Sequence, residues 1–188
     1  TQVPKMMLEL GRGAKGRRIA VTQPRRLAAV TMAERVAQEI SPSPSPSPSS
    51  AGGLVGYRHR YAKAISSETR IEFLTDGVLL AETRFDPLLR MYDTIIVDEA
   101  HERSLNVDFL LGILKRILER RRDLKVIIAS ATMDTLKFAE FFDAPVINVP
   151  GRLFPIDIRY RADDEDGEMD LQEAVAAAVR ELPSEGDV

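Results

Sequence analysis

The chain has 188 residues, of which 44% are hydrophobic and 29% charged, a composition typical of a globular protein with a substantial core. Its formal net charge of −3 gives the whole chain no attraction to nucleic acid or acidic membranes, so a polyanion would have to bind local basic patches. The absence of cysteine excludes disulfides, thiolate catalysis and the commonest zinc sites. No apolar run approaches the roughly 20 residues that cross a bilayer, so we expect an intracellular protein without a membrane partner.

The first third of the chain predicts a helix, a strand and a second helix. Apolar residues at helical spacing over residues 3–10 indicate a helix that ends at glycines. A short apolar strand follows at 18–22, and a helix with one apolar side, which includes Leu27, follows at 27–40. The Ser/Pro stretch that comes next is incompatible with helix and sheet, so residues 41–53 are predicted to be a surface insertion.

Four further segments predict strands, at residues 54–57, 70–75, 94–97 and 125–129. They are continuously apolar, as expected of central parallel strands that helices cover on both faces. Asp76-Gly77 is predicted to form a turn, and residues 107–121 a crossover helix. The repeated order of strand and helix therefore predicts an α/β fold, a doubly wound parallel sheet flanked by helices.

The last third predicts a short helix around Phe138, a strand at Val146–Val149 and a further strand at 156–160. An acidic, solvated linker and a helix at 171–182 follow. We expect a first domain over residues 1–150, and over residues 151–188 a linker with the start of a second domain.

Asp98 and Glu99 directly follow a buried strand, so both carboxylates are expected at the carboxyl edge of the sheet, where open α/β folds bind ligands. One carboxylate there can hold Mg²⁺ through water while its neighbour orients or deprotonates an attacking water, as phosphoryl transfer to water requires. The structural alternative is an acidic pair that only caps the next helix. A zinc-protease reading of His101-Glu102 is excluded, because the second histidine it requires is replaced by Leu105.

Three more motifs occur in order around this pair, each at the end of a predicted strand: Thr22–Arg26, Thr75–Gly77 and Ser130–Thr132. Together with Asp98–His101 they make a set of four motifs in a fixed order. In these four motifs the sequence resembles the DEAH-box RNA helicases of superfamily 2, and specifically their first RecA-like motor domain. The resemblance implies ATP and Mg²⁺ as cofactors, single-stranded RNA as partner, and a second RecA-like domain and an accessory activator protein as further partners.

The resemblance also implies a role for each matching residue. Asp98 would hold magnesium through water and Glu99 would activate the hydrolytic water, which agrees with the physical reading. His101 would act with Ser130 and Thr132 to couple the nucleotide state to the grip on RNA. The bland alternatives are a histidine without a partner at a helix start and hydroxyls that cap the following turns.

Basic residues after the strands are the candidates for RNA contact. Arg25 and Arg26 follow a strand end, where guanidinium groups and helix-start amides can meet phosphates. Arg60 belongs to a second basic cluster between two tyrosines, from Tyr57 to Lys63, which resembles a stretch near the RNA path of the family. The remaining expected contacts, from the resemblance, come from Thr75, Asp76 and Gly77. Solvated surface arginine is the alternative reading.

The phosphate-binding loop Gly-x-x-x-x-Gly-Lys-Ser/Thr does not occur in these residues. By resemblance the chain is expected to begin just after that loop, with Thr1 at or next to its closing hydroxyl residue and so in the nucleotide site. The leading hypothesis is an ATP-dependent RNA helicase whose activity belongs to the full-length protein, cytoplasmic if bacterial and nuclear or cytoplasmic if eukaryotic. The alternatives are a non-catalytic RNA-binding scaffold and another nucleic-acid-stimulated ATPase that acts on DNA.

Overall fold

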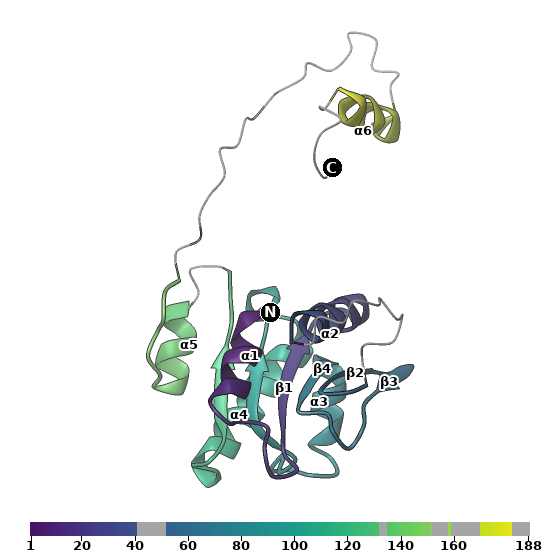
Figure 1. Cartoon of the computed structure of the whole chain (residues 1–188). Coiled ribbons are helices and arrows are strands. Elements are labelled where there is room, and N and C mark those ends of the chain that lie inside the picture. Colours follow the sequence, from purple (N-terminus) through teal and green to yellow (C-terminus); the bar gives the residue numbers. More distant parts are fainter. Residues whose placement is uncertain (41–51, 132–134, 150, 152–157, 159–169, 182–188) are drawn as a thin grey trace. The chain divides into compact units, whose positions relative to one another are not determined.

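The computed structural model describes residues 1–40, 52–131, 135–149, 151, 158 and 170–181. The chain divides into two units, Thr1–Ile147 and Asn148–Val188. The first contains the whole sheet and the second contains one helix, α6 (Leu171–Arg180) (Figure 1). The predicted domain assignments, 1–150 and 151–188, remain predictions, and residues 41–51 of the predicted Ser/Pro insertion lie outside the described part.

The sheet contains six strands, most of them buried along their length as their apolar sequences predict. The strands are β1 (Arg18–Gln23), β2 (Val55–His59), β3 (Ala62–Ala64), β4 (Ile71–Thr75), β5 (Tyr92–Val97) and β6 (Lys125–Ile128). The other helices are α1 (Gln2–Glu9), α2 (Arg26–Ile40), α3 (Asp76–Glu82), the 3₁₀ helix η1 (Ala100–Glu102), α4 (Leu105–Arg120) and α5 (Thr135–Phe142).

The strand order is β3-β2-β4-β1-β5-β6, and all neighbours are parallel except the β2–β3 hairpin. The first strand in the chain is thus interior, with Val21 opposite Phe73 of β4 on one side and Ile96 of β5 on the other. Because the chain extends the sheet from both sides of β1 and returns through helices, the predicted doubly wound α/β fold is confirmed.

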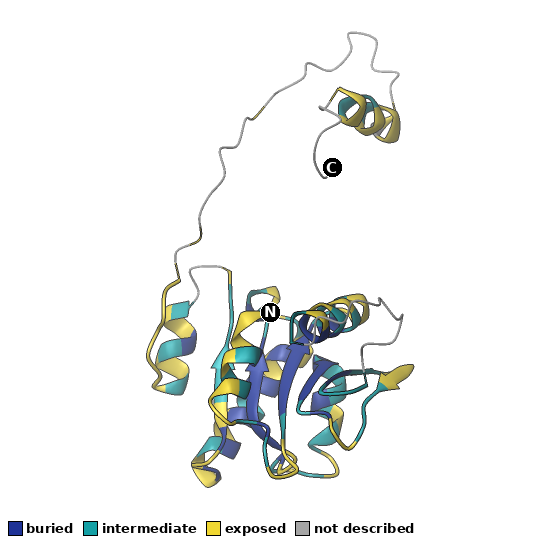
Figure 2. Cartoon of the chain, in the orientation of Figure 1, coloured by how far each residue is buried: buried dark blue, intermediate teal, exposed yellow. Residues whose placement is uncertain are grey.

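Helices cover both faces of the sheet, each over its own apolar cluster (Figure 2). On one face, Ile19 and Val21 of β1 pack with Ala33 and Val36 of α2. On the other, Ala20 belongs to a cluster that α3, α4 and α5 complete through Leu79, Leu110, Leu114 and Phe138. Alternate residues of β1 therefore pack against the helices on opposite faces of the sheet, as the period of two in a strand requires.

Three details differ from the sequence-based expectation. Val146–Val149 is not a strand, and Ile147 is 84% exposed, because no described strand lies beside it to pair with its backbone. Asp76 and Gly77 form the first turn of α3 and not a separate turn. Leu27, expected inward, is 77% exposed at the start of α2. The strand expected at 156–160 lies outside the described residues except for Ile158, which is irregular.

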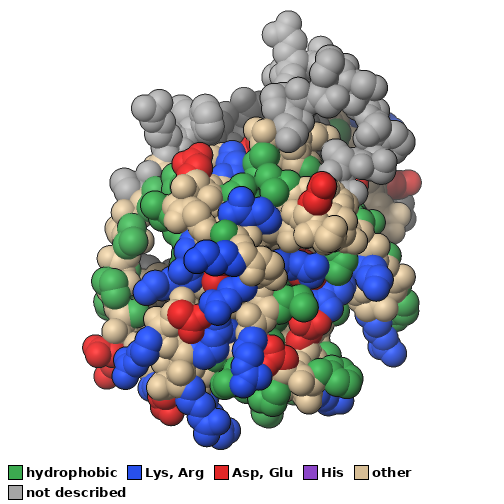
Figure 3. Space-filling view, turned by 60° about the horizontal axis from the view of Figure 1, so that its bottom comes forward, with side chains coloured by type: hydrophobic (Ala, Val, Ile, Leu, Met, Phe, Trp, Pro, Cys, Tyr) green, Lys and Arg blue, Asp and Glu red, His purple; other side chains and the backbone are tan. Residues whose placement is uncertain are grey.

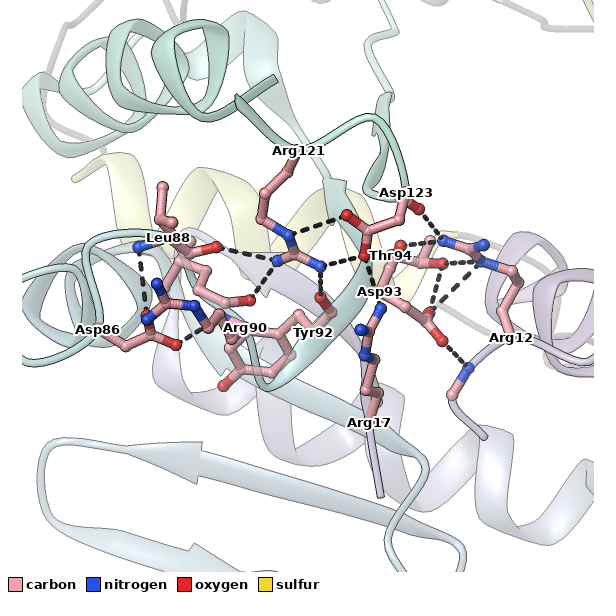
Figure 4. Close-up of polar contacts among 12 residues, drawn as sticks. Arg12, Arg17, Asp86, Leu88, Arg90, Tyr92, Asp93, Thr94, Arg121 and Asp123 are labelled. Atoms are coloured by element: carbon pink, nitrogen blue, oxygen red, sulfur yellow. Dashed lines mark hydrogen bonds and ion pairs between the residues drawn. The ribbon is translucent and has the colours of Figure 1, made fainter. Parts of the chain in front are cut away.

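Basic side chains gather at the edge of the sheet where its parallel strands begin (Figure 3). One of them, Arg121 at the end of α4, is only 7% exposed. Its Nη1 donates to the carbonyls of Leu88 (2.9 Å) and Leu89 (2.7 Å), and its Nη2 donates to the carbonyl of Tyr92 (2.9 Å). The carboxylate of Asp123 accepts from Nη2 at 2.7 Å. One guanidinium thus fixes the end of α4 to the chain that enters β5 (Figure 4).

A second arginine extends this network to the loop before β1. Arg12 donates from Nε to the Thr94 hydroxyl at 2.9 Å, and the Asp93 carboxylate accepts from the Gly13 N–H at 2.8 Å (Figure 4). Hydrogen bonds from Arg121 and then from Arg17 hold the pKa of Asp123 well below its usual range. The network therefore joins three segments that are distant in sequence.

Among the described residues, no helix combines the length and apolar character that a membrane span requires.

We predict that Arg121→Met lowers the free energy of unfolding by about 2–4 kcal/mol, because it leaves several buried carbonyls without their charged donor. Urea denaturation measures the effect. The matched control is Arg122→Met at the exposed neighbouring position, where the change should stay within about 0.5 kcal/mol. Equal effects of the two substitutions would contradict the structural role of Arg121.

Candidate functional site

Polar residues follow the carboxyl ends of four neighbouring strands and form the candidate site. Gln23 ends β1, Thr75 ends β4, Asp98 follows β5, and Ser130 follows β6 by two positions. These strands are parallel neighbours, so their carboxyl ends meet at one edge of the sheet. β1 lies between β4 and β5, which is the position where open α/β sheets bind ligands.

Asp98 is held by two N–H donors, one for each carboxylate oxygen. The Gln23 side-chain amide donates to Oδ2 at 2.7 Å, and the backbone N–H of Glu99 donates to Oδ1 at 3.0 Å. Gln23 is only 3% exposed, so its amide is fixed by packing. The carboxylate is oriented but keeps lone pairs for a hydrated cation.

Glu99 adopts a left-handed conformation, with φ 53° and ψ 36°, which is uncommon for a residue other than glycine. The N–H of Ala129 donates to the Val97 carbonyl at 2.8 Å, and the N–H of Ala100 donates to the Ala129 carbonyl at 3.0 Å. These bonds continue the β5–β6 pairing past the strand ends. They hold a bend that costs about 1–3 kcal/mol and leave the Glu99 side chain 45% exposed.

His101 lies between Glu99 and the chain that follows β6. Its Nε2 is 3.3 Å from Glu99 Oε2, and its Nδ1 accepts from the backbone N–H of Ala131 at 3.4 Å. The two ring nitrogens thus face different segments, Nε2 the Glu99 carboxylate and Nδ1 the Ala131 backbone. The histidine thus bridges two of the predicted motifs through a short chain of polar contacts.

Asp76 lies inside the protein, at 3% exposure, and its side chain does not reach the surface where RNA was expected. Its Oδ1 and the hydroxyl of the fully buried Thr22 both lack a hydrogen-bond partner of good geometry in the described part of the chain. Burial raises the pKa of the Asp76 carboxyl, the facing Thr22 hydroxyl opposes this, and the charges of Glu102 and Asp98 raise it further. The RNA contacts expected of Thr75 and Gly77 remain predictions.

Two arginines predicted separately for RNA meet at one aromatic ring. The guanidinium carbon of Arg26 lies 4.9 Å from the centre of the Tyr61 ring, and that of Arg60 lies 5.6 Å from it. Tyr61 follows β2 in the hairpin and is 69% exposed. Arg25 is also exposed, and its ion pair with Glu102 is a loose one of 3.8 Å. The exposed cations and the ring are arranged as a surface that could bind phosphates and bases.

Arg58, part of the same basic cluster in sequence, belongs instead to the interior. Its Nε donates to the fully buried Glu72 at 2.7 Å and its Nη2 to the Tyr92 hydroxyl at 2.9 Å, and it also pairs with Glu82. Burial, with the Glu72 charge beside it, raises the pKa of Tyr92 well above its usual range. Arg58 lies within β2, whereas the exposed Arg60 follows the end of that strand.

The remaining predicted site residues are placed only in part. Thr1 precedes α1 and is exposed, and Figure 1 shows the start of the chain toward the edge where the strands end. Ser130 lies within the described chain after β6, whereas Thr132 lies outside the described residues. No group of three potential metal-binding side chains occurs in the described residues, so Asp98 would need water or phosphate oxygens to complete a magnesium shell.

Thr22 and Gln23 lie within the predicted Thr22–Arg26 motif, but sequence reasoning gave neither residue a role of its own at the site. Both are polar residues at the end of an otherwise apolar buried strand, and this position was the available signal. A polar side chain that ends a central strand is buried against its neighbours and must find a partner there.

No family model matches the chain. It is 51% identical over 194 aligned residues to the ATP-dependent RNA helicase HrpA of Escherichia coli K12, an alignment that covers 100% of the chain and 14% of that protein. The HrpA homolog of Haemophilus influenzae is 50% identical over 188 residues, 99% of the chain and 14% of the relative. A probable ATP-dependent RNA helicase of Caenorhabditis elegans, a DHX35 homolog, is 43% identical over 171 residues, 85% of the chain and 22% of the relative. The chain thus spans about a seventh of the length of the HrpA proteins.

We predict that Asp76→Asn preserves or raises stability at pH 8, because the amide has the same shape but no ionisation to suppress. The pKa of Asp76 in the folded protein lies above the ordinary value of 3.8. Ionisation of this carboxyl therefore lowers the free energy of unfolding of the native protein as the pH rises from about that value. The stability of Asp76→Asn relative to the native protein, measured by urea denaturation, should therefore decrease as the pH falls from 8 to 4. Asp76→Ala, which deletes the group facing Thr22, should cost about 1–3 kcal/mol. An Asn variant less stable than the Ala variant at pH 8 would contradict an unfavourable effect of burial on the ionised Asp76 carboxylate.

Proposed function

The chain belongs to the DEAH-box RNA helicase family, and from this premise we propose that it forms the first motor domain of an enzyme that couples Mg-ATP hydrolysis to movement on RNA and its remodelling. The observation that carries this proposal is the chain of polar contacts Gln23, Asp98, Glu99, His101 and Ala131 at the carboxyl edge of the sheet. These contacts connect Asp98 and Glu99, which are suited to nucleotide chemistry, with the segment after β6, which could move when the nucleotide changes. The activity is proposed for the full-length protein.

Asp98 is the proposed magnesium residue. Its oxygens are the hard donors that Mg²⁺ prefers, and the donors on either side orient the carboxylate without removing all its lone pairs. A single carboxylate agrees with binding through water, with phosphate oxygens as the other ligands. When bound, the ion would neutralise charge that develops on the transferred phosphoryl group.

Glu99 is the proposed residue that orients or deprotonates the attacking water. Its bend directs the side chain away from the core, where it remains 45% exposed beside His101. The imidazole Nε2 lies 3.3 Å from this carboxylate. A change in the Ser130–Thr132 segment would therefore move His101 and with it Glu99, which is the proposed coupling route.

RNA is the proposed partner at the same edge. Arg25, Arg26 and Arg60 supply exposed cations for phosphates, and Tyr61 supplies a ring for a base. The Thr75 hydroxyl makes no capping bond to α3, which leaves it available for a phosphate oxygen. These contacts read the backbone, so little base specificity is proposed. A second RecA-like domain and an accessory activator protein are proposed as further partners.

We predict that Glu99→Gln in the full-length protein lowers the kcat of RNA-stimulated ATP hydrolysis by about 10²–10⁴-fold, because the amide cannot accept the proton of the attacking water. The affinity for single-stranded RNA should change less than about twofold. Glu119→Gln is the matched control, an exposed isosteric change on α4, and should leave both quantities unaltered.

Three outcomes would change the assignment. Normal turnover by Glu99→Gln would remove the proposed role of Glu99 and leave the RNA surface intact. A full-length protein that binds RNA but hydrolyses no ATP would favour the non-catalytic RNA-binding scaffold. Stronger stimulation by single-stranded DNA than by RNA would favour an ATPase that acts on DNA.

A further inference from the structure

A pocket of about 360 Å³ lies at the opposite end of the sheet from the candidate site, where the strands begin. Two segments form it: the loop between α1 and β1, and the turn before β4. The candidate site uses none of these residues. The residues that line the pocket are Gly13 to Arg18 and Ser67 to Arg70.

The loop is held in shape by backbone conformation and by hydrogen bonds. Gly13 (φ 67°) and Gly16 (φ 76°) adopt left-handed conformations, and so does Lys15 (φ 56°) between them. A side chain on Gly13 would bring a Cβ to 2.9 Å from the Arg70 carbonyl oxygen. Arg70 in turn donates to the carbonyls of Gly13 and Arg12, each at 2.8 Å. The pocket wall is therefore preformed and needs little ordering on binding.

The charges around the pocket divide into structural and available groups. Four cations, Lys15, Arg17, Arg18 and Arg70, face one acidic lining residue, Glu68. Arg18 is engaged by the buried Glu72, and Arg17 pairs with Asp123 at 2.6 Å. Lys15 is exposed and has no ionic partner in the described chain, so its ammonium is available.

The net charge of the chain hides this positive face. Only four of the 26 Lys and Arg residues follow residue 147, against 11 of the 29 Asp and Glu residues. The unit that contains the sheet therefore has an excess of four positive charges within a chain of net −3. Figure 3 shows Lys and Arg side chains prominent on the face where the strands begin. A polyanion that approaches this unit meets an attractive field on that face.

We propose that this pocket, with Lys15 at its rim, is a second binding site for the phosphate backbone of RNA, occupied by the part of a long strand that extends beyond the candidate site. The proposal rests on the proposed function for the identity of the polyanion. Ammonium, guanidinium and the exposed Ser67 hydroxyl are groups that bind phosphate oxygens without reading sequence. A β-strand of about 6 residues, at about 3.3 Å each, is roughly 20 Å long, which is the distance between the two ends of the sheet. An RNA that only fills the candidate site would therefore not reach the pocket, whereas a longer RNA would.

The test compares two RNAs on the full-length protein, one of about 8 nucleotides and one of about 30, by fluorescence anisotropy over a range of salt concentrations. Lys15→Asn removes the charge but keeps a residue that tolerates the left-handed conformation. It should weaken binding of the long RNA about threefold and reduce the salt slope by about 0.7, the value for one phosphate of a single strand. Binding of the short RNA should not change.

Glu68→Gln provides the opposite change, because it removes the one acidic group that lines the pocket. It should strengthen binding of the long RNA about twofold, a result that a damaged fold would not produce. Arg116→Gln, an equal loss of charge on the exposed side of α4, is the control and should alter neither RNA.

Three outcomes would overturn the inference: an unchanged salt slope in Lys15→Asn, equal loss for both RNAs, or weaker binding in Glu68→Gln. Binding of an acidic peptide, and not of long RNA, that responds to both substitutions would assign the pocket to a protein partner. Failure of the short RNA to bind the unmodified protein would instead count against the proposed function.

Discussion

The parallel register between β1 and β5 is the constraint on which the candidate site depends. Thr22 lies opposite Val97, so the next residues along the two strands, Gln23 and Asp98, come side by side as the sheet ends. The hydrogen bond between them at 2.7 Å then orients the carboxylate. A slip of one residue would turn these side chains to opposite faces of the sheet and separate the pair. The apolar clusters on the two faces, which fix the register, therefore also fix the chemistry.

The two edges of the sheet differ in how their buried polar groups are bonded. Glu99 and Arg103 have left-handed backbones, and Asp76 and Thr22 carry buried oxygens without partners. At the other edge, Arg121 fixes three carbonyls and Arg12 joins the first loop to β5. Strain persists at a site only when the surrounding structure imposes it. At Glu99 the backbone bonds between Val97, Ala129 and Ala100 impose it.

Sequence alone predicted the architecture well because the signal is redundant. Continuous apolar strands separated by helical segments left few topologies, and β1, β4, β5 and β6 lie close to their predicted ranges. The candidate site was predicted less completely. The neighbours Asp98, Glu99 and His101 formed a readable motif, but the role of Gln23 depends on which strand lies next to β5, which is a long-range property.

The differences between the local sequence patterns and the structure have physical causes of the same kind. Val146–Val149 is apolar enough for a strand, yet without a partner strand it remains irregular and exposed. Arg58 belongs to a basic run in sequence, but within β2 it pairs with the buried Glu72. Asp76 lies in a predicted RNA motif and is buried because α3 begins at that residue. In each case a tertiary contact decided what the local pattern left open.

The central claim is that the edge formed by Gln23, Asp98, Glu99 and His101 is the hydrolytic half of a nucleotide site. Its most direct test is an experimental structure of the full-length protein with RNA, Mg²⁺ and ADP-aluminium fluoride, which imitates the transferred phosphoryl group. The account predicts Mg²⁺ bound to Asp98 through water, the Gln23–Asp98 hydrogen bond retained, and the attacking water in contact with Glu99. Nucleotide and metal bound at another edge, or an attacking water held by a residue other than Glu99, would contradict it.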